Sequence, residues 1–199
     1  MRNFLHAVRK DVRAYLRLDP ATSNVFQLIF FNASFHGLLL YRISHLFYEW
    51  KLYPLAYIFY YLKRVLFSMD IHPAAKIEPG VVIDHGIGVV IGSTASVGSN
   101  TVIYQGVTLG AKKICTGKRH PDIGRNVLIG AGAKILGPIK VGDNSIIGAN
   151  AVVLRDVPPN SLAVGVPARI LRRDSRDAEF SRQYPHGEVE DRVEGVCET

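Results

Sequence analysis

The sequence predicts a mainly β protein, a parallel β-helix, behind an α-helical N-terminal region. Two observations support this fold class: an apolar residue recurs at every sixth position over about half of the chain, and the residues before the first repeat are strongly apolar. A period of six fits neither the helical turn of about 3.6 residues nor the alternation of a strand. In a β-helix each group of six residues forms one short strand and one turn, and stacked coils bury each other's inward residues.

Residues 1–68 form the predicted α-helical region. The first 19 residues have the pattern of an amphipathic helix, and Asp19-Pro20 and Pro54 mark helix boundaries. The stretch 25–67 is apolar, but charged residues interrupt it before any run approaches the roughly 20 apolar residues of a membrane-spanning helix. Two or three buried helices are therefore expected there.

Residues 69–170 form the predicted β-helix domain, and its repeats fall into three runs. The inward residues are Ile71, Ile77 and Ile83, then Ile91, Val97, Ile103 and Leu109, then Ile123, Ile129, Ile135, Val141, Ile147 and Val153. Glycine follows seven of them, where small size or a positive φ suits a tight turn. The alternative, an antiparallel sandwich, requires period-2 alternation. The polar tail, 171–199, has little to bury and is expected to be disordered beyond its first residues.

The two breaks between these runs predict where functional groups lie. The step across 83–91 is eight residues long and contains Asp84-His85, and the step across 109–123 is fourteen residues long. The longer step contains a basic loop that ends in Arg119-His120-Pro121. Because a regular coil cannot absorb extra residues, both insertions must project from it, and loops on a rigid scaffold often hold functional groups.

Asp70 and His85 are a candidate catalytic pair. They are 15 residues apart, close to one coil of about 18 residues, so the carboxylate and the imidazole are expected on neighbouring coils near one corner. A carboxylate on one imidazole nitrogen leaves the other free to take a proton from an alcohol. The spacing equally allows Asp70 to end the coil and His85 to be an exposed turn residue.

A metal site and a nucleic-acid site are both disfavoured. His72, His85 and His120 are 13 and 35 residues apart, which is not the spacing of metal ligands, so no metal is expected. The net charge is +7, but no basic run is interleaved with aromatic residues, so an anionic small ligand is a better expectation than nucleic acid. Two cysteines without framework spacing favour a reducing, cytoplasmic location.

Several blocks of the sequence together resemble the serine O-acetyltransferases, hexapeptide-repeat enzymes with a left-handed β-helix. The blocks are DPA at 19–21, FHGLLLYRISH at 35–45, DIHPAAKI at 70–77, DHGIGVVIG at 84–92, QGVTLG at 105–110, GKRHP at 117–121, GAGAKILG at 130–137 and VPPNSLAVGVPARI at 157–170. The resemblance implies transfer of an acetyl group from acetyl-CoA to the hydroxyl of L-serine, the first step of cysteine biosynthesis.

The resemblance also assigns roles to individual residues. His85 becomes the general base and Asp70 its orienting partner. The residues that would hold the amino acid are Asp19, Asp84, Arg119 and His120. Small residues along a groove between subunits would meet acetyl-CoA, here Ala111, Ala131 and Ala149. The implied assembly is a homotrimer or a pair of such trimers.

Some features of the chain depart from this family. The family can dock a C-terminal isoleucine into the sulfhydrylase that follows it in the pathway, whereas this chain ends in Thr199, so no stable complex with that enzyme is expected. Ser93 stands where the common pattern has glutamate. Another hydroxyl acceptor (homoserine, a sugar or a xenobiotic) is the alternative activity, and a non-enzymatic trimeric scaffold is a further alternative.

Overall fold

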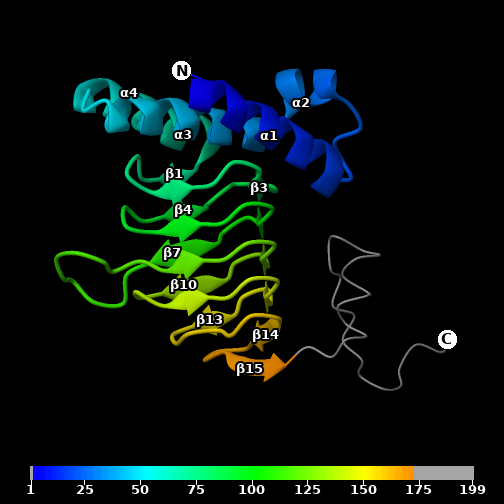
Figure 1. Cartoon of the computed structure of the whole chain (residues 1–199), viewed down its shortest axis with the longest axis vertical. Coiled ribbons are helices and arrows are strands. Elements are labelled where there is room, and N and C mark those ends of the chain that lie inside the picture. Colours follow the sequence, from blue (N-terminus) through cyan, green and yellow to red (C-terminus); the bar gives the residue numbers. More distant parts are fainter. Residues whose placement is uncertain (1, 173–199) are drawn as a thin grey trace.

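The structure is a computed structural model, which describes residues 2–172. It is a left-handed parallel β-helix, with four helices lying across the end of the stack where the repeats begin (Figure 1). The helices are α1 (Arg2–Leu18), α2 (Val25–Phe31), α3 (Ala33–Glu49) and α4 (Tyr53–Phe67). None of the described helices is long and apolar enough to cross a membrane.

The strands stack into three sheets, which are the three faces of the coil. Sheet A contains β1 (Asp70–Ile71), β4 (Val90–Ile91), β7 (Thr108–Gly110), β10 (Lys134–Leu136) and β13 (Val152–Val153). Sheet B contains β2 (Lys76–Ile77), β5 (Ser96–Val97), β8 (Asp122–Ile123) and β11 (Lys140–Val141). Sheet C contains β3 (Val82–Ile83), β6 (Val102–Ile103), β9 (Leu128–Ile129), β12 (Ile146–Ile147), β14 (Ser161–Val164) and β15 (Arg169–Arg172).

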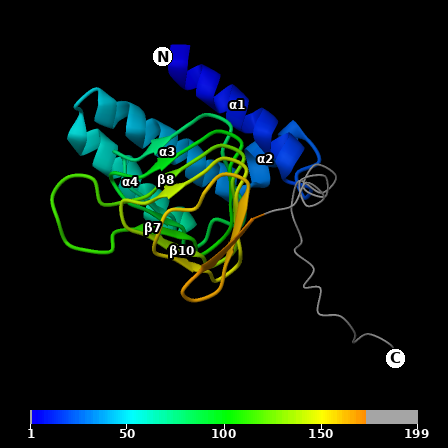
Figure 2. The same ribbon diagram turned by 60° about the horizontal axis from the view of Figure 1, so that its bottom comes forward.

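The predicted inward residues form the core of the coil. They lie opposite one another in the parallel ladders, for example Ile71 beside Ile91 and Ile91 beside Leu109, and all of them are at most 6% exposed. The eight-residue step forms a turn between sheets C and A. The fourteen-residue step forms the loop that projects from the coil after β7 (Figure 2). Both breaks in the period therefore project outward, as predicted.

The glycines that follow the inward residues are required for their small size. A Cβ atom on Gly98 would lie 2.5 Å from the carbonyl oxygen of Gly124, and one on Gly142 would lie 2.4 Å from the nitrogen of Pro159 in the next coil. Within residues 2–172 the positive φ angles fall on other residues, among them Asn126, whose φ is 53°. The sequence left both explanations for these glycines open, and the close approach of neighbouring coils is the correct one.

The last strand closes the far end of the coil. β15 pairs antiparallel with β14, a reversal that the six-residue period did not predict. It includes Leu171 and Arg172, which the sequence assigned to the polar tail. The rest of that tail, 173–199, lies outside the described residues.

The helices cover the three unpaired strand edges of the first coil. β1, β2 and β3 are each the first strand of their sheet, so the carbonyls of their inward isoleucines have no strand above them. Each carbonyl accepts a hydrogen bond from a side chain of a different helix: Ile71 from Lys63 of α4, Ile77 from Arg42 of α3, and Ile83 from Tyr15 of α1. Covering an exposed edge in this way prevents it from pairing with another chain.

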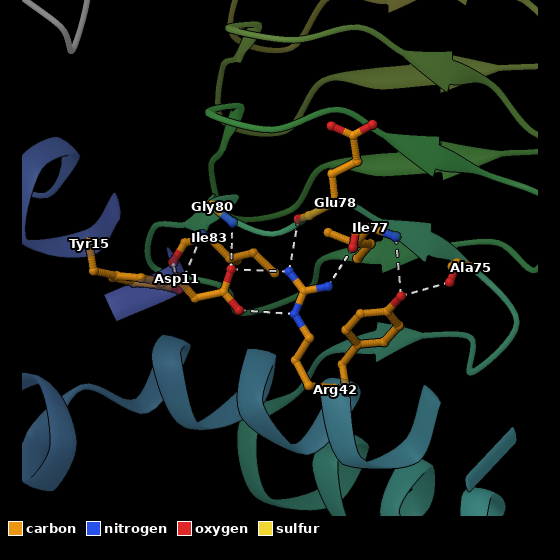
Figure 3. A network of polar contacts seen from close by, with 9 residues as sticks. Asp11, Tyr15, Arg42, Ala75, Ile77, Glu78, Gly80 and Ile83 are labelled. Carbon is orange, nitrogen blue, oxygen red and sulfur yellow. Dashed lines mark hydrogen bonds and ion pairs between the residues drawn. The ribbon is translucent and has the colours of Figure 1, made fainter. Parts of the chain in front are cut away.

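Arg42 is also at the centre of a buried ion pair (Figure 3). Its Nε lies 2.9 Å from Oδ2 of Asp11 on α1, and both side chains are at most 6% exposed. The other oxygen of Asp11 accepts the backbone N–H of Gly80 at 2.7 Å. Burial raises the pKa of Asp11 and the Arg42 guanidinium opposes that rise. One arginine therefore ties α1, α3 and the first coil together.

Replacing Arg42 tests this arrangement. Arg42→Ala leaves the buried carboxylate of Asp11 without its counter-ion and the carbonyls of Ile77 and Glu78 without this donor, so we expect the free energy of unfolding to fall by about 3–5 kcal/mol. The matched control is Arg125→Ala, because Arg125 forms an exposed pair with Glu78 at 3.4 Å; that pair is worth about 0–1 kcal/mol. Urea unfolding of both variants gives the comparison, and equal losses would contradict the capping role.

Candidate active site

The turn after β3 is held firmly from three sides. The hydroxyl of Tyr15 donates to the carbonyl of Ile83 at 2.9 Å and accepts its N–H at 3.2 Å. The N–H of Gly86 donates to Oγ of Ser34, at the start of α3, at 2.9 Å. The N–H of Gly88 donates to the carbonyl of Ser68 at 2.9 Å. Helix α1, helix α3 and the end of α4 therefore fix the turn that contains Asp84 and His85.

His85 is presented outward on this turn. Its φ is 49°, a left-handed conformation that non-glycine residues rarely adopt and that costs of order 1–3 kcal/mol. The side chain is 76% exposed, and its Nε2 lies 3.6 Å from Oδ1 of Asp84. An accessible imidazole beside a carboxylate, on a backbone strained to hold it there, is suited to accept a proton from a bound alcohol.

Asp19 belongs to the same part of the molecule. It directly follows α1, and its N–H donates to the carbonyl of Tyr15 at 2.9 Å. Its buried carboxylate accepts the N–H of Ala21 at 2.9 Å and the hydroxyl of Thr22 at 2.6 Å. Burial raises the pKa of Tyr15, and the charges of Asp11, Asp19 and Asp84 add to that rise. We call Asp19, Asp84 and His85 the acidic group.

Asp70 is not part of the acidic group. Its Oδ1 accepts a short hydrogen bond from the hydroxyl of Tyr60, and its Oδ2 lies 3.6 Å from Nη1 of Arg64. Within residues 2–172, no hydrogen bond or ion pair joins Asp70 to His85. Asp70 and His85 therefore do not pair within one chain. Asp70 begins β1 of sheet A, whereas His85 projects from the corner between β3 of sheet C and β4 of sheet A.

Arg119 and His120 lie at a different corner, between sheets A and B. The hydroxyl of Thr94 accepts the N–H groups of both residues at 3.1 Å. The Arg119 side chain reaches back to the carbonyl of Cys115 at 3.0 Å, inside the projecting loop. We call Arg119 and His120 the basic group.

The surroundings of His120 favour its neutral imidazole. Burial lowers its pKa, and the charges of Arg119 and Lys118 lower it further. The N–H of Thr94 donates to Nδ1 of His120 at 3.2 Å, so Nδ1 is an acceptor and the proton belongs on Nε2. The ring packs against Gly92, where a Cβ atom would lie 2.1 Å from Nε2. His120 can therefore donate a hydrogen bond to an anionic or carbonyl oxygen.

The three small residues predicted to meet acetyl-CoA divide between these corners. Ala131 and Ala149 lie on successive coils at the corner between sheets C and A, because the N–H of Asn150 donates to the carbonyl of Ala131 at 2.8 Å. Together with Gly106 and Gly88 they form a column of small residues that leads toward the turn of His85. The N–H of Gly106 donates to the carbonyl of Ile87 at 2.9 Å, which places Gly106 beside that turn. Ala111 lies apart from them, at the start of the projecting loop.

The column of Gly88, Gly106, Ala131 and Ala149 is built from small residues. Its residues carry no side chain or only a methyl, and they lie along one edge of the coil with His85 near its upper end. The coils approach so closely that a Cβ atom on Gly132 would lie 2.2 Å from Oδ1 of Asn150. In the part of the chain that the structure describes, no three metal-ligating side chains are close enough to hold an ion.

Comparison with known proteins places the chain in a family. Residues 120–155 match the family described as bacterial transferase hexapeptide (six repeats). A serine acetyltransferase of Mycobacterium tuberculosis is 47% identical over 167 residues, which are 84% of this chain and 73% of that protein. The chain belongs to the serine acetyltransferase family.

Solved structures of the serine acetyltransferase family agree with this fold. The enzyme of Neisseria gonorrhoeae in complex with serine is 41% identical with a TM-score of 0.81, over 84% of this chain and 69% of that one. The enzyme of Brucella abortus in complex with coenzyme A is 41% identical with a TM-score of 0.83, over 86% and 69% of the two chains.

Sequence reasoning missed the residues that support the site. Tyr15, Thr94 and Tyr60 each contact a predicted site residue or its turn across 10 to 68 positions of sequence. Tyr15 lies at an apolar position of an amphipathic helix, and nothing distinguishes it there from an ordinary core residue. Of these three residues, only Thr94 could have been suspected from the sequence, because it directly follows Ser93, which departs from the family pattern.

Lys63 is a buried cation beside Asp70. It is fully buried, caps the carbonyl of Ile71, and lies over the rings of Tyr41 and Tyr60 at 5.7 and 5.0 Å. Burial lowers the pKa of Lys63 to about 7, while the charge of Asp70 opposes that fall. Partial burial of Tyr60, together with its hydrogen bond to Asp70, raises the pKa of Tyr60 to about 12.

The low pKa of Lys63 predicts a pH-dependent stability in this member of the serine acetyltransferase family. Above pH 7 the folded lysine loses its proton, whereas an unfolded lysine keeps it up to about pH 10.4. The unfolded state then binds more protons, so the free energy of unfolding rises with pH by up to about 1.4 kcal/mol per unit. We expect Lys63→Met to remove this rise between pH 7 and 9, measured by urea unfolding.

Lys76→Met, at an exposed lysine of β2, is the matched control and keeps the wild-type slope. If Lys63→Met retained the full dependence on pH, its amine would not be the group responsible.

Proposed function

We propose that the protein transfers the acetyl group of acetyl-CoA to the hydroxyl of L-serine, which gives O-acetylserine for cysteine synthesis. The observation that supports this most strongly is that Asp84 and the exposed imidazole of His85 lie at one corner of the β-helix, connected through Tyr15 to Asp19, while an arginine and a histidine lie at another corner. The first set suits an ammonium and a hydroxyl. The second suits a carboxylate.

The proposed mechanism is direct transfer in a ternary complex. His85 accepts the proton of the serine hydroxyl while that oxygen attacks the thioester carbonyl, and the thiol of CoA leaves. Asp19 and Asp84 bind the ammonium of serine, while Arg119 and His120 bind its carboxylate. A positioned general base supplies about 10²- to 10⁴-fold of rate, and holding the two substrates in line supplies much of the rest.

The site is proposed to form between two copies of the chain. The acidic and basic groups lie at different corners of the β-helix, so we propose that a single serine does not reach both within a chain. A homotrimer with cyclic symmetry brings one corner of each subunit against another corner of its neighbour. The column of Ala131 and Ala149 then faces the loop that contains Ala111, which makes a groove for acetyl-CoA. Asp70 is proposed to orient His85 only in this assembly, which forms a trimer or a pair of trimers.

The other acceptors differ in what they offer these residues. A neutral sugar or a xenobiotic gives no partner to the buried carboxylate of Asp19 or to Arg119. Homoserine has the same charged groups, and its extra methylene is worth only about 1–3 kcal/mol of discrimination. A scaffold would release no CoA at all. We propose a cytoplasmic location for the enzyme.

A thiol-release assay with acetyl-CoA tests the proposed activity. We expect release with L-serine to exceed that with homoserine, threonine and glucose, because homoserine and threonine each add one carbon to serine and glucose lacks the charged groups. Greater release with another acceptor would overturn the serine assignment, and no release with any acceptor would favour the scaffold.

His85→Ala tests the base. We expect kcat to fall about 10²- to 10⁴-fold at an unchanged melting temperature, because the proton acceptor is lost while the turn keeps its supports. His6→Ala, on an exposed histidine of α1, is the control and keeps wild-type kcat. Near-wild-type turnover of His85→Ala would exclude His85 as the base.

Mixed trimers test the shared site. His85→Ala and Arg119→Ala are each expected to be nearly inactive, but co-expression places an intact His85 opposite an intact Arg119 at about one interface in four. Activity near a quarter of the wild-type value is therefore expected for the mixture. If the mixture were as inactive as its parents, each site would lie within one chain.

A further inference from the structure

We propose that Tyr15 is a positioning residue for acetyl transfer: it fixes Asp19 and the Asp84-His85 turn relative to each other across the junction between α1 and the first coil. The inference rests on the proposed function, because it concerns residues to which that function gives roles. Tyr15 lies outside the sequence blocks that resemble the family, and its proposed role does not require contact with either substrate.

Tyr15 is hydrogen-bonded to Asp19 and to Ile83, the residue before Asp84. Its hydroxyl donates to the carbonyl of Ile83 at 2.9 Å and accepts the N–H of the same residue at 3.2 Å. Ile83 immediately precedes Asp84. The carbonyl of Tyr15 accepts the N–H of Asp19 at 2.9 Å. Tyr15 therefore connects Asp19, which follows α1, to the strand that leads into His85.

The chemistry of the hydroxyl suits a rigid connection. Burial raises the pKa of Tyr15, so the phenol stays neutral and can donate and accept at once. The ring is fully buried and packs edge-on against Phe35, with centroids 5.5 Å apart. Phe35 follows Ser34, which accepts the N–H of Gly86 on the other side of His85. The turn is therefore held by hydrogen bonds on both sides of His85, at Ile83 and at Gly86.

Tyr41 provides an internal control for this role. Its hydroxyl donates to the carbonyl of Ala75 at 2.7 Å and accepts the N–H of Ile77 at 3.2 Å, the same pattern on the neighbouring strand β2. It is also fully buried. Neither Ala75 nor Ile77 adjoins the acidic group. The two tyrosines cap the coil in the same way, and only one of them is next to the site.

The experiment compares Tyr15→Phe with Tyr41→Phe, each with the ring retained. We expect similar losses of melting temperature, because each removes one buried hydroxyl from a strand edge. Kinetics well below the melting temperature should separate them. For Tyr15→Phe, kcat/KM for serine should fall about 10- to 100-fold, with a higher KM for serine and an unchanged KM for acetyl-CoA. Tyr41→Phe should stay within about twofold of wild type, which is a change of under half a kcal/mol.

Three outcomes overturn the inference or its basis. If Tyr15→Phe keeps wild-type kinetics while His85→Ala is inactive, Tyr15 only stabilises the fold and the inference is wrong. If both tyrosine variants lose the same kcat/KM, the effect is general loosening of the cap and the inference is again wrong. If His85→Ala is active, the role that the proposed function gives to His85 fails, whatever Tyr15→Phe does.

Discussion

The open edge of the first coil is the constraint on which the rest of this structure depends. Each strand of that coil has N–H and C=O groups with no strand above them, and a buried group left without a partner costs about 1–3 kcal/mol. Tyr15, Arg42 and Lys63 each cap the carbonyl of one inward isoleucine, and each comes from a different helix. These hydrogen bonds fix the positions of the three helices relative to the first coil.

The same contacts place the candidate site. The helix that caps β3 is followed directly by Asp19, and the strand that it caps leads into Asp84 and His85, so the contact that closes the coil also positions the acidic group. The basic group is positioned independently, by Thr94 at another corner. A rigid coil holds the two groups apart within a chain. The proposed symmetric assembly is the physical means by which both can meet one substrate.

The sequence predicted the coil well because its signal is local and repeated. One apolar residue in six identified the whole inward column, and the two breaks in that period identified both projecting segments. The reason for the glycines and the reversal at β15 depend on contacts between coils, which no local pattern encodes. The pairing of Asp70 with His85 is not formed within a chain, because a separation near one coil length does not specify which corner a side chain leaves from. The role of Tyr15 could not be predicted either, because its contact with Ile83 spans 68 positions of sequence.

Hydrogen exchange at two amides tests the capping of the first coil most directly. The N–H groups of Ile77 and Ile83 face away from the next coil and donate to the hydroxyls of Tyr41 and Tyr15 at 3.2 Å. If side chains of the helices close this edge, both amides should exchange as slowly as strand amides in the middle of the coil. Exchange of either amide at the rate of an exposed loop would show that the edge is open and would contradict the account.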